Sequence, residues 1–243
     1  MSFGDDADDR DKRPAAGEAS ATSEAAERMR RYTARALGGP RSVDTCALIS
    51  RRVARDIDGE VDALRAAGAA LACEAGCAFC CHQRVGVFPH EAAALWTHLK
   101  IAMPPDLAAA IEERIAANAR AIDAMTAEEH RAARMPCAFL VDGRCSAYEV
   151  RPSACASYHS LSRARCEYAF EHPEHAGTPR ASRPALRDLR SFTSDLVAGV
   201  ESGFAAAGVS TGKGELHHRV RAIAEDPGVI DRWLAGVPFE SQN

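Results

Sequence analysis

The sequence predicts a mainly α-helical protein, an irregular helical domain with a small β-hairpin, built around a cluster of cysteines. Apolar residues recur at helical spacing over several long stretches. Hydrophobic residues make up 47% of the chain but aromatics only 6%, and alanine supplies much of the remainder, which is typical of closely packed helices. Eight of the nine cysteines fall between positions 73 and 166. These three observations give the fold class.

The first 40 residues are predicted to be a largely disordered tail. Residues 1–20 are rich in Asp, Arg, Ala, Gly and Ser, a composition that cannot build a core. A short amphipathic helix is predicted at about 21–36, ended by Gly38-Gly39-Pro40. A long helix then begins at Asp44 and runs toward the first cysteines. Its apolar stripe consists of Leu48, Val53, Ile57, Val61 and Leu64.

Residues between the two groups of cysteines predict a helical insert. A short extended link at 85–88 leads into helices at 90–102, about 107–124 and 127–134. Asp106 is a plausible N-cap for the second of these helices. The insert carries no chemical motif, and we interpret it as scaffold.

Residues 137–148 predict a β-hairpin that turns at Asp142-Gly143. A two-residue type I′ turn would place Cys137 and Cys145 on opposite faces. A type I turn with a G1 bulge at Gly143 would place both on one face. If both cysteines serve one site, the bulged form is required.

A further helix is predicted to start at Arg151-Pro152-Ser153, since proline favours the first helical position. Cys155 would lie in its first or second turn, with His159 four residues on and on the same face. Cys166 lies in a charged, loop-like stretch.

The last part of the chain contains no cysteine and predicts helices at about 184–206, 214–225 and 228–235. We therefore expect a cysteine-cluster domain over 41–180 and a C-terminal helical segment, 181–243, that packs on it.

Composition excludes several functions. The net charge of −4 gives no general attraction to nucleic acid or anionic lipid. The acidic N-terminus has no apolar signal region, and no stretch is long and apolar enough for a membrane span. We expect a cytoplasmic protein whose thiols stay reduced, which argues against a disulfide framework.

The spacing of the first four cysteines limits how they can bind metal. Cys73, Cys77, Cys80 and Cys81 would share one face of a continuous helix. Cys73 and Cys80 would then lie about 10 Å apart along the axis, too far for one zinc ion. Either the helix breaks, most plausibly at Gly76, and wraps one ion or cluster, or the run divides its ligands between two sites.

Thiolates at this density are typical of a site for zinc, iron or an iron–sulfur cluster. Cys46 stands apart and is predicted to be a core residue. His82 and His159 are candidate ligands or hydrogen-bond donors to ligands, although a solvated or capping role is favoured for each. The other histidines are predicted to lie at the surface: 90, 98, 130, 172, 175, 217 and 218.

The pattern over residues 70–170 resembles bacterial cysteine-cluster proteins with a CxxCxxCC signature, described as zinc- or iron-chelating. The run Cys-x3-Cys-x2-Cys-Cys-His is followed in order by Cys-x-Phe-Leu-x-Asp-Gly-Arg-Cys-Ser-x-Tyr-Glu-x-Arg-Pro-x-x-Cys, Ser-Tyr-His-Ser and a final cysteine. Two departures are the three-residue first gap and Ala156, where a basic residue is expected. The resemblance implies a metal-binding set of Cys73, Cys77, Cys80, Cys81, Cys137, Cys145, Cys155 and Cys166.

Two functions follow from such a set. The first is a metal-binding protein that chelates zinc or iron, including iron in an iron–sulfur cluster, through eight thiolates. The alternative is an iron–sulfur oxidoreductase or an iron-dependent protein- or peptide-modifying enzyme. The sequence offers no cofactor-binding glycine-rich loop, and it identifies no catalytic residue and no protein partner.

Overall fold

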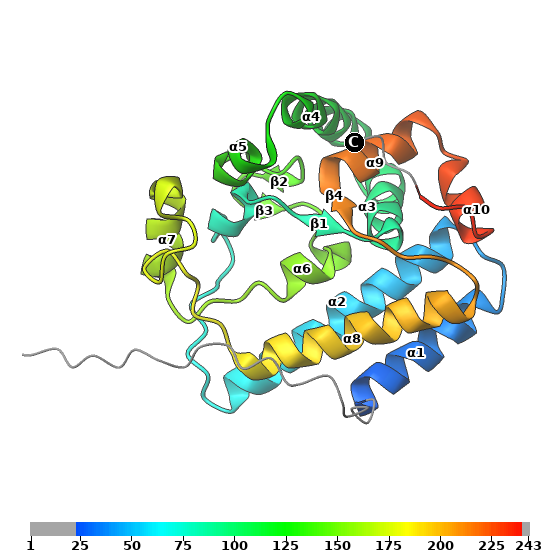
Figure 1. The fold of residues 1–243 in the computed structure, drawn as a ribbon, viewed down its shortest axis with the longest axis horizontal. Helices are drawn as coiled ribbons and strands as arrows, with labels where there is room; N and C mark the ends of the chain where they lie inside the picture. The colour runs from blue at the N-terminus through cyan, green and yellow to red at the C-terminus, as the bar shows by residue number, and fades with distance from the viewer. Residues whose placement is uncertain (1–22, 240–243) are drawn as a thin grey trace, which may run out of the picture.

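The computed structural model of the chain describes residues 23–239, and the predicted disorder of residues 1–20 lies outside them. The described residues form ten α-helices, three 3₁₀ helices and two small antiparallel sheets (Figure 1). The mainly α prediction is confirmed. None of the described helices combines the length and the apolar character that crossing a membrane requires. The elements are α1 (Glu24–Leu37), α2 (Val43–Ala66), η1 (Phe79–His82), β1 (Gly86–Val87), α3 (Pro89–Ile101), α4 (Pro105–Asp123), α5 (Ala127–Ala132), β2 (Leu140–Val141), β3 (Arg144–Cys145), η2 (Tyr148–Val150), α6 (Ser153–Ala156), α7 (Arg163–Glu171), η3 (Pro173–His175), α8 (Arg187–Ala206), β4 (Gly214–Glu215), α9 (Leu216–Glu225) and α10 (Val229–Leu234).

The long helices α1, α2 and α8 lie together along one side of the molecule (Figure 1). Two glycines of α8 allow α1 to approach closely. A Cβ on Gly199 would stand 2.3 Å from the carbonyl oxygen of Ala26, and one on Gly203 would stand 2.5 Å from Cβ of Thr33. The predicted helix at 21–36 is confirmed by α1 and is packed into the fold.

One hydrophobic core takes side chains from all parts of the described chain. Met29, Leu95 and Trp233 belong to the same buried cluster. The division of the chain at residues 40 and 180 stays a prediction, because the packing itself marks no boundary at either position.

Helix α3 is the centre of the core. The consecutive residues Ala92, Ala93, Ala94 and Leu95 are all buried, so the helix is covered on every side. Helix α2 packs on α3 from one direction, and α4 and α9 from others. The apolar run Ala92–Leu95 suits this interior position. The predicted insert of three helices is confirmed by α3, α4 and α5.

A short sheet joins the C-terminal segment to the chain that follows the first cysteines. Gly86 of β1 pairs with Glu215 of β4, and the amide of Leu216 donates to the carbonyl of Val85 over 3.0 Å. The extended link at 85–88 was predicted, but its partner strand was not. Helix α9 starts directly after β4, so this pairing fixes α9 beside α3 and α4.

The predicted hairpin forms, but its turn has no bulge. The spacing of the residues had indicated that a bulge is required if Cys137 and Cys145 serve one site. Val141 pairs with Arg144 across a two-residue turn, in which Asp142 has φ +48° and Gly143 φ +73°. These values define a type I′ turn. The requirement was wrong because Cys137 is not in the strand. A turn closed by Leu140 N–H donating to Cys137 C=O, 2.9 Å, bends the chain first, so strand alternation does not decide where Cys137 points.

Two predictions about the later cysteines are also corrected. Helix α6 contains Cys155 but ends at Ala156, so His159 does not share its face. Cys166 lies in helix α7 and not in a loop; Ser162 caps that helix by accepting from the amide of Arg165. The C-terminal helices are confirmed as α8, α9 and α10.

Candidate metal centre

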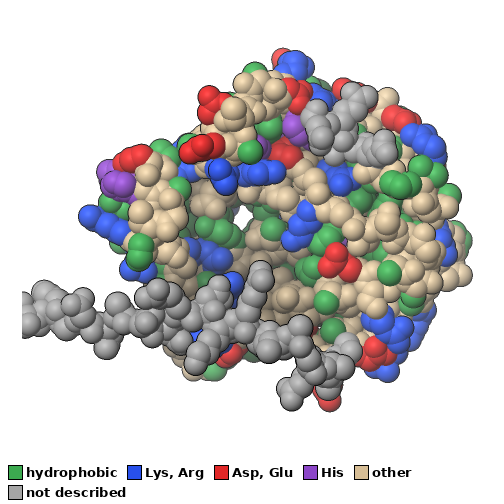
Figure 2. Space-filling model, in the orientation of Figure 1, with side chains coloured by type: hydrophobic (Ala, Val, Ile, Leu, Met, Phe, Trp, Pro, Cys, Tyr) green, Lys and Arg blue, Asp and Glu red, His purple; other side chains and the backbone are tan. Residues whose placement is uncertain are grey.

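Six short segments bring the eight clustered cysteines toward one region of the molecule. All nine cysteines are free, and Cys46 is buried apart from the cluster, in the core as predicted. Figure 2 shows a hollow beside α6 and β1, with Lys or Arg side chains on its rim. The contributions are Cys73 and Cys77 from the segment after α2, Cys80 and Cys81 from η1, Cys137 from the turn before β2, Cys145 from β3, Cys155 from α6 and Cys166 from α7.

The first cysteine run is interrupted at Gly76, as predicted. Helix α2 ends at Ala66, and the amide of Cys77 donates to the carbonyl of Glu74 over 3.1 Å, which closes a tight turn. Gly76 adopts φ +88°, a conformation that side chains with a Cβ rarely adopt. The 3₁₀ helix η1 follows and carries the adjacent pair of cysteines.

Cys73, Cys77 and Cys166 form a first group. Burial raises the pKa of Cys73 and that of Cys77. The nearby charges of Cys80 and Cys166 raise both pKa values further. Helix α7 therefore brings Cys166 to the first cysteine run, although it follows Cys81 by 85 positions in the sequence.

Cys137, Cys145 and Cys155 form a second group. Burial raises the pKa of Cys137 and that of Cys145 to about 11, and it raises the pKa of Cys155 well above its ordinary value. The charge of Cys80 contributes to all three increases. A hydrogen bond to Cys81 raises the pKa of Cys80 itself, ahead of burial. The two groups therefore meet at η1.

Backbone amides point at several of the sulfurs. The Ser160 amide donates to Sγ of Cys73 over 3.3 Å. Three other sulfurs each accept a hydrogen bond from the backbone amide of the second residue after the cysteine. This local hydrogen bond favours the thiolate and so lowers the pKa of the thiol. These pairs are Phe79 with Cys77, Phe139 with Cys137, and Ala147 with Cys145.

Arginines oppose the accumulation of negative charge. Each arginine lowers the pKa of a nearby thiol. This effect is smaller than that of burial or of a neighbouring cysteine, which raises the same pKa. The pairs are Arg163 with Cys77, Arg183 with Cys80, Arg114 with Cys137, and Arg151 with Cys145.

Main-chain hydrogen bonds tie the cysteine segments together. The amide of Cys137 donates to the carbonyl of Cys81 over 2.7 Å, which joins η1 to the hairpin segment. The amide of Ala72 donates to the carbonyl of Ser160 over 2.8 Å, which joins the first run to the loop after α6. The gathering of the cysteines is thus part of the fold.

The donors suit a soft or borderline metal. Neighbouring thiolates repel one another, and a bound cation would remove that repulsion. Within residues 23–239, no three cysteine sulfurs lie within 4.8 Å of one another. Four thiolates at about 2.3 Å from one zinc would lie about 3.8 Å apart. Binding a single zinc ion would therefore draw these segments closer together.

Glu91 and Arg151 hold α6 in place, and sequence reasoning missed the role of Glu91. The Glu91 side chain is buried and accepts from the amides of Phe88, 2.9 Å, and Ser153, 2.8 Å, so it bridges the starts of α3 and α6. Arg151 is buried and forms an ion pair with Asp58 of α2. The signal for Glu91 was its place at the third position of a helix that begins with proline.

The two histidines considered as ligands have other contacts. His82 Nδ1 donates to the carbonyl of Ala78 over 3.0 Å, and its ring meets Phe170 edge-on. The charges that act on His159 come from Arg65, Arg151 and Asp58. Burial is the largest cause that lowers the pKa of His159.

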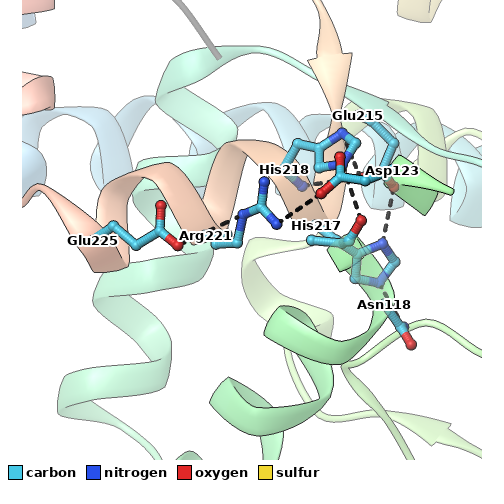
Figure 3. Close-up of polar contacts among 8 residues, drawn as sticks. Asn118, Asp123, Glu215, His217, His218, Arg221 and Glu225 are labelled. Atoms are coloured by element: carbon cyan, nitrogen blue, oxygen red, sulfur yellow. Dashed lines mark hydrogen bonds and ion pairs between the residues drawn. The ribbon is translucent and has the colours of Figure 1, made fainter. Parts of the chain in front are cut away.

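The prediction that the remaining histidines lie at the surface is wrong for His90, His130 and His217, which are buried. Figure 3 shows His217 between Glu215 and Asn118. Its Nε2 accepts from the amide of Ala138, 3.3 Å, and from Asn118 Nδ2, 3.1 Å. Its Nδ1 therefore carries the hydrogen and donates to Glu215 over 2.9 Å.

The same network fixes both neighbours of Cys137. His217 accepts from the amide of Ala138 on one side, and Asn118 Nδ2 donates to the carbonyl of Pro136, 2.9 Å, on the other. Helices α4 and α9 thereby position Cys137, a candidate ligand that lies outside both helices.

Comparison with known families supports the metal interpretation. Residues 72–175 match the family model CxxCxxCC, described as "Putative zinc- or iron-chelating domain". This range includes all eight clustered cysteines and stops before the C-terminal helices. No curated protein and no solved structure matches the chain. Residues 72–175 are thus similar to a family that is described as chelating zinc or iron.

Proposed function

We propose that this chain chelates zinc or iron through the thiolates of its eight clustered cysteines, held in two neighbouring sites. One observation carries the proposal: cysteines from six segments gather in two groups that meet at η1. Sulfur-rich donor sets favour zinc and iron–sulfur centres. Backbone amides and arginines on the thiols favour the charged form that binds metal.

Cys80 and Cys81 are proposed to divide between the two sites. Each group contributes three cysteines, and each of the adjacent pair supplies a fourth. Neighbouring side chains diverge, which suits two centres better than one. The first site is Cys73, Cys77 and Cys166 with one member of the pair; the second is Cys137, Cys145 and Cys155 with the other.

Metal content of the anaerobically purified, untagged chain tests the proposal. We expect about two zinc or iron ions per chain if each site holds one ion. Zinc without visible absorbance would indicate closed, redox-silent sites. Iron with acid-labile sulfide would instead favour the iron–sulfur alternative. A folded chain without metal and with eight reactive thiols would contradict the proposal.

Single substitutions test the division into two sites. Cys77→Ser and Cys145→Ser are each expected to lose about half of the metal, since each removes a ligand from one site. Cys46→Ala is the matched control, because it removes a cysteine that lies in the core. Loss of all metal in both variants would favour one shared centre; full retention in either would remove that residue from the ligand set.

A further inference from the structure

A cluster outside the cysteine set also brings metal-ligating side chains together. Among the described residues, His172, Glu174 and His175 place their ligand atoms within 4.8 Å of one another. The carboxylate oxygen Oε1 of Glu174 lies 3.1 Å from Nδ1 of His172 and 3.9 Å from Nδ1 of His175.

The local sequence His-Pro-Glu-His encodes this arrangement. His172 is the C-cap residue that follows α7, and Pro173 begins the 3₁₀ helix η3 directly after it. The amide of His175 donates to the carbonyl of His172 over 3.0 Å, and residues three apart in such a turn lie one above the other. Their rings accordingly stack, with centroids 5.4 Å apart and planes 24° from parallel.

A neighbouring aromatic residue helps to orient the rings. The hydroxyl of Tyr168 lies 2.6 Å from Nδ1 of His175. The Tyr168 ring also contacts His172, at 4.4 Å between centroids, and the guanidinium of Arg180 lies 4.1 Å from its centre. The Tyr168 hydroxyl is thus hydrogen-bonded to Nδ1 of His175. A metal ion would have to displace this hydroxyl or bind next to it.

We propose that His172, Glu174 and His175 form a separate metal site, for a divalent cation such as Zn²⁺ or Ni²⁺. Two imidazoles and one carboxylate are borderline-to-hard donors, unlike the all-sulfur set. The three side chains are 41%, 60% and 46% exposed, so water can complete the coordination and the ion can exchange. This site binds its ion whether or not the cysteine thiolates hold metal.

Nickel binding by the untagged, full-length chain tests this site. The chain is first loaded with Zn²⁺ and desalted until exchangeable zinc, including any at this exposed site, has been removed. It is then dialysed against increasing Ni²⁺, with bound nickel and retained zinc both measured. We expect one additional Ni²⁺ per chain without loss of zinc. His175→Ala and Glu174→Gln should each weaken this binding about tenfold or more.

Glu171→Gln is the matched control, because Glu171 is an exposed carboxylate at the end of the same helix, outside the triad. It should bind Ni²⁺ as the unaltered chain does. The proposal is overturned if the unaltered chain binds no additional nickel, if His175→Ala binds it normally, or if Glu171→Gln weakens it as much as Glu174→Gln. Cys77→Ser should retain the nickel site, which separates failure here from failure of the thiolate proposal.

Discussion

His90 is a buried base that the fold holds neutral. Its ring stacks between Phe88 and Phe204, with centroids 5.6 and 5.1 Å away, and only 2% of the residue is exposed. Burial lowers its pKa to about 4 from the ordinary value of 6.5. Within residues 23–239, Nδ1 has no hydrogen-bond partner, and the charge of Glu91 offsets the effect of burial only in part.

This lowered pKa predicts a loss of stability in mild acid. Between about pH 6.5 and 4 the unfolded chain takes up a proton at His90 that the folded chain does not, so the free energy of unfolding falls as the pH falls. The full difference is up to about 3 kcal/mol. His90→Phe keeps the ring stack and removes the titration. Denaturant unfolding at pH 7, 5.5 and 4 should therefore show a smaller decline for the variant.

Both chains carry the same cysteines, so acid-dependent metal loss cancels in the comparison. Parallel declines for the two chains across this pH range would show that His90 does not titrate as proposed.

The contact between helices α1 and α8 depends on the absence of a side chain at Gly203. A Cβ there would meet Cβ of Thr33 at 2.5 Å. Gly203→Ala is therefore expected to destabilise the protein by about 1–3 kcal/mol through overpacking, despite the better helix propensity of alanine. Gly59 in α2 is the matched control, since its Cβ would meet no atom of the described residues within 4 Å.

Gly59→Ala should stabilise the protein by about 0.5–1 kcal/mol. Thermal or urea unfolding of the two variants decides the point. Equal effects at both positions would mean that helix propensity, and not close packing, governs Gly203.

Helices with a marked apolar face could be predicted from sequence, whereas α7 and β4 could not. Helices α2 and α4 repeat buried residues at helical spacing. Helix α7 has no buried residue, so no periodicity marks it. Strand β4 is two residues long and is defined only by its distant partner Gly86-Val87. The hairpin was predicted, but the turn that removes Cys137 from its strand is set by contacts with η1 and α9.

At the scale of the whole molecule, the sequence identified which cysteines belong to the candidate site but not how they group. Cys166 joins Cys73 and Cys77 only because α7 folds back onto η1. Such proximity arises from tertiary packing and leaves no mark in the spacing of the residues. The break at Gly76, by contrast, is local and could be predicted.

The candidate site also depends on residues beyond the matched range of 72–175. His217, on α9, accepts from the amide of Ala138 next to Cys137. His217→Ala would leave that buried amide without a partner, which costs about 1–3 kcal/mol. It should also loosen Cys137 and so increase the rate at which a chelator removes metal, although His217 is not among the proposed ligands.

His218→Ala is the matched control for this prediction. His218 is the next residue on α9, and its ring contacts Asp123 and the carbonyl of Ala119, away from the cysteine segment. Metal release to an excess of chelator should be faster in His217→Ala than in His218→Ala when the two variants are compared at equal stability, adjusted with urea. Equal release rates would confine His217 to a general role in stability, whereas a difference would show that the C-terminal helices help to hold the metal centre together.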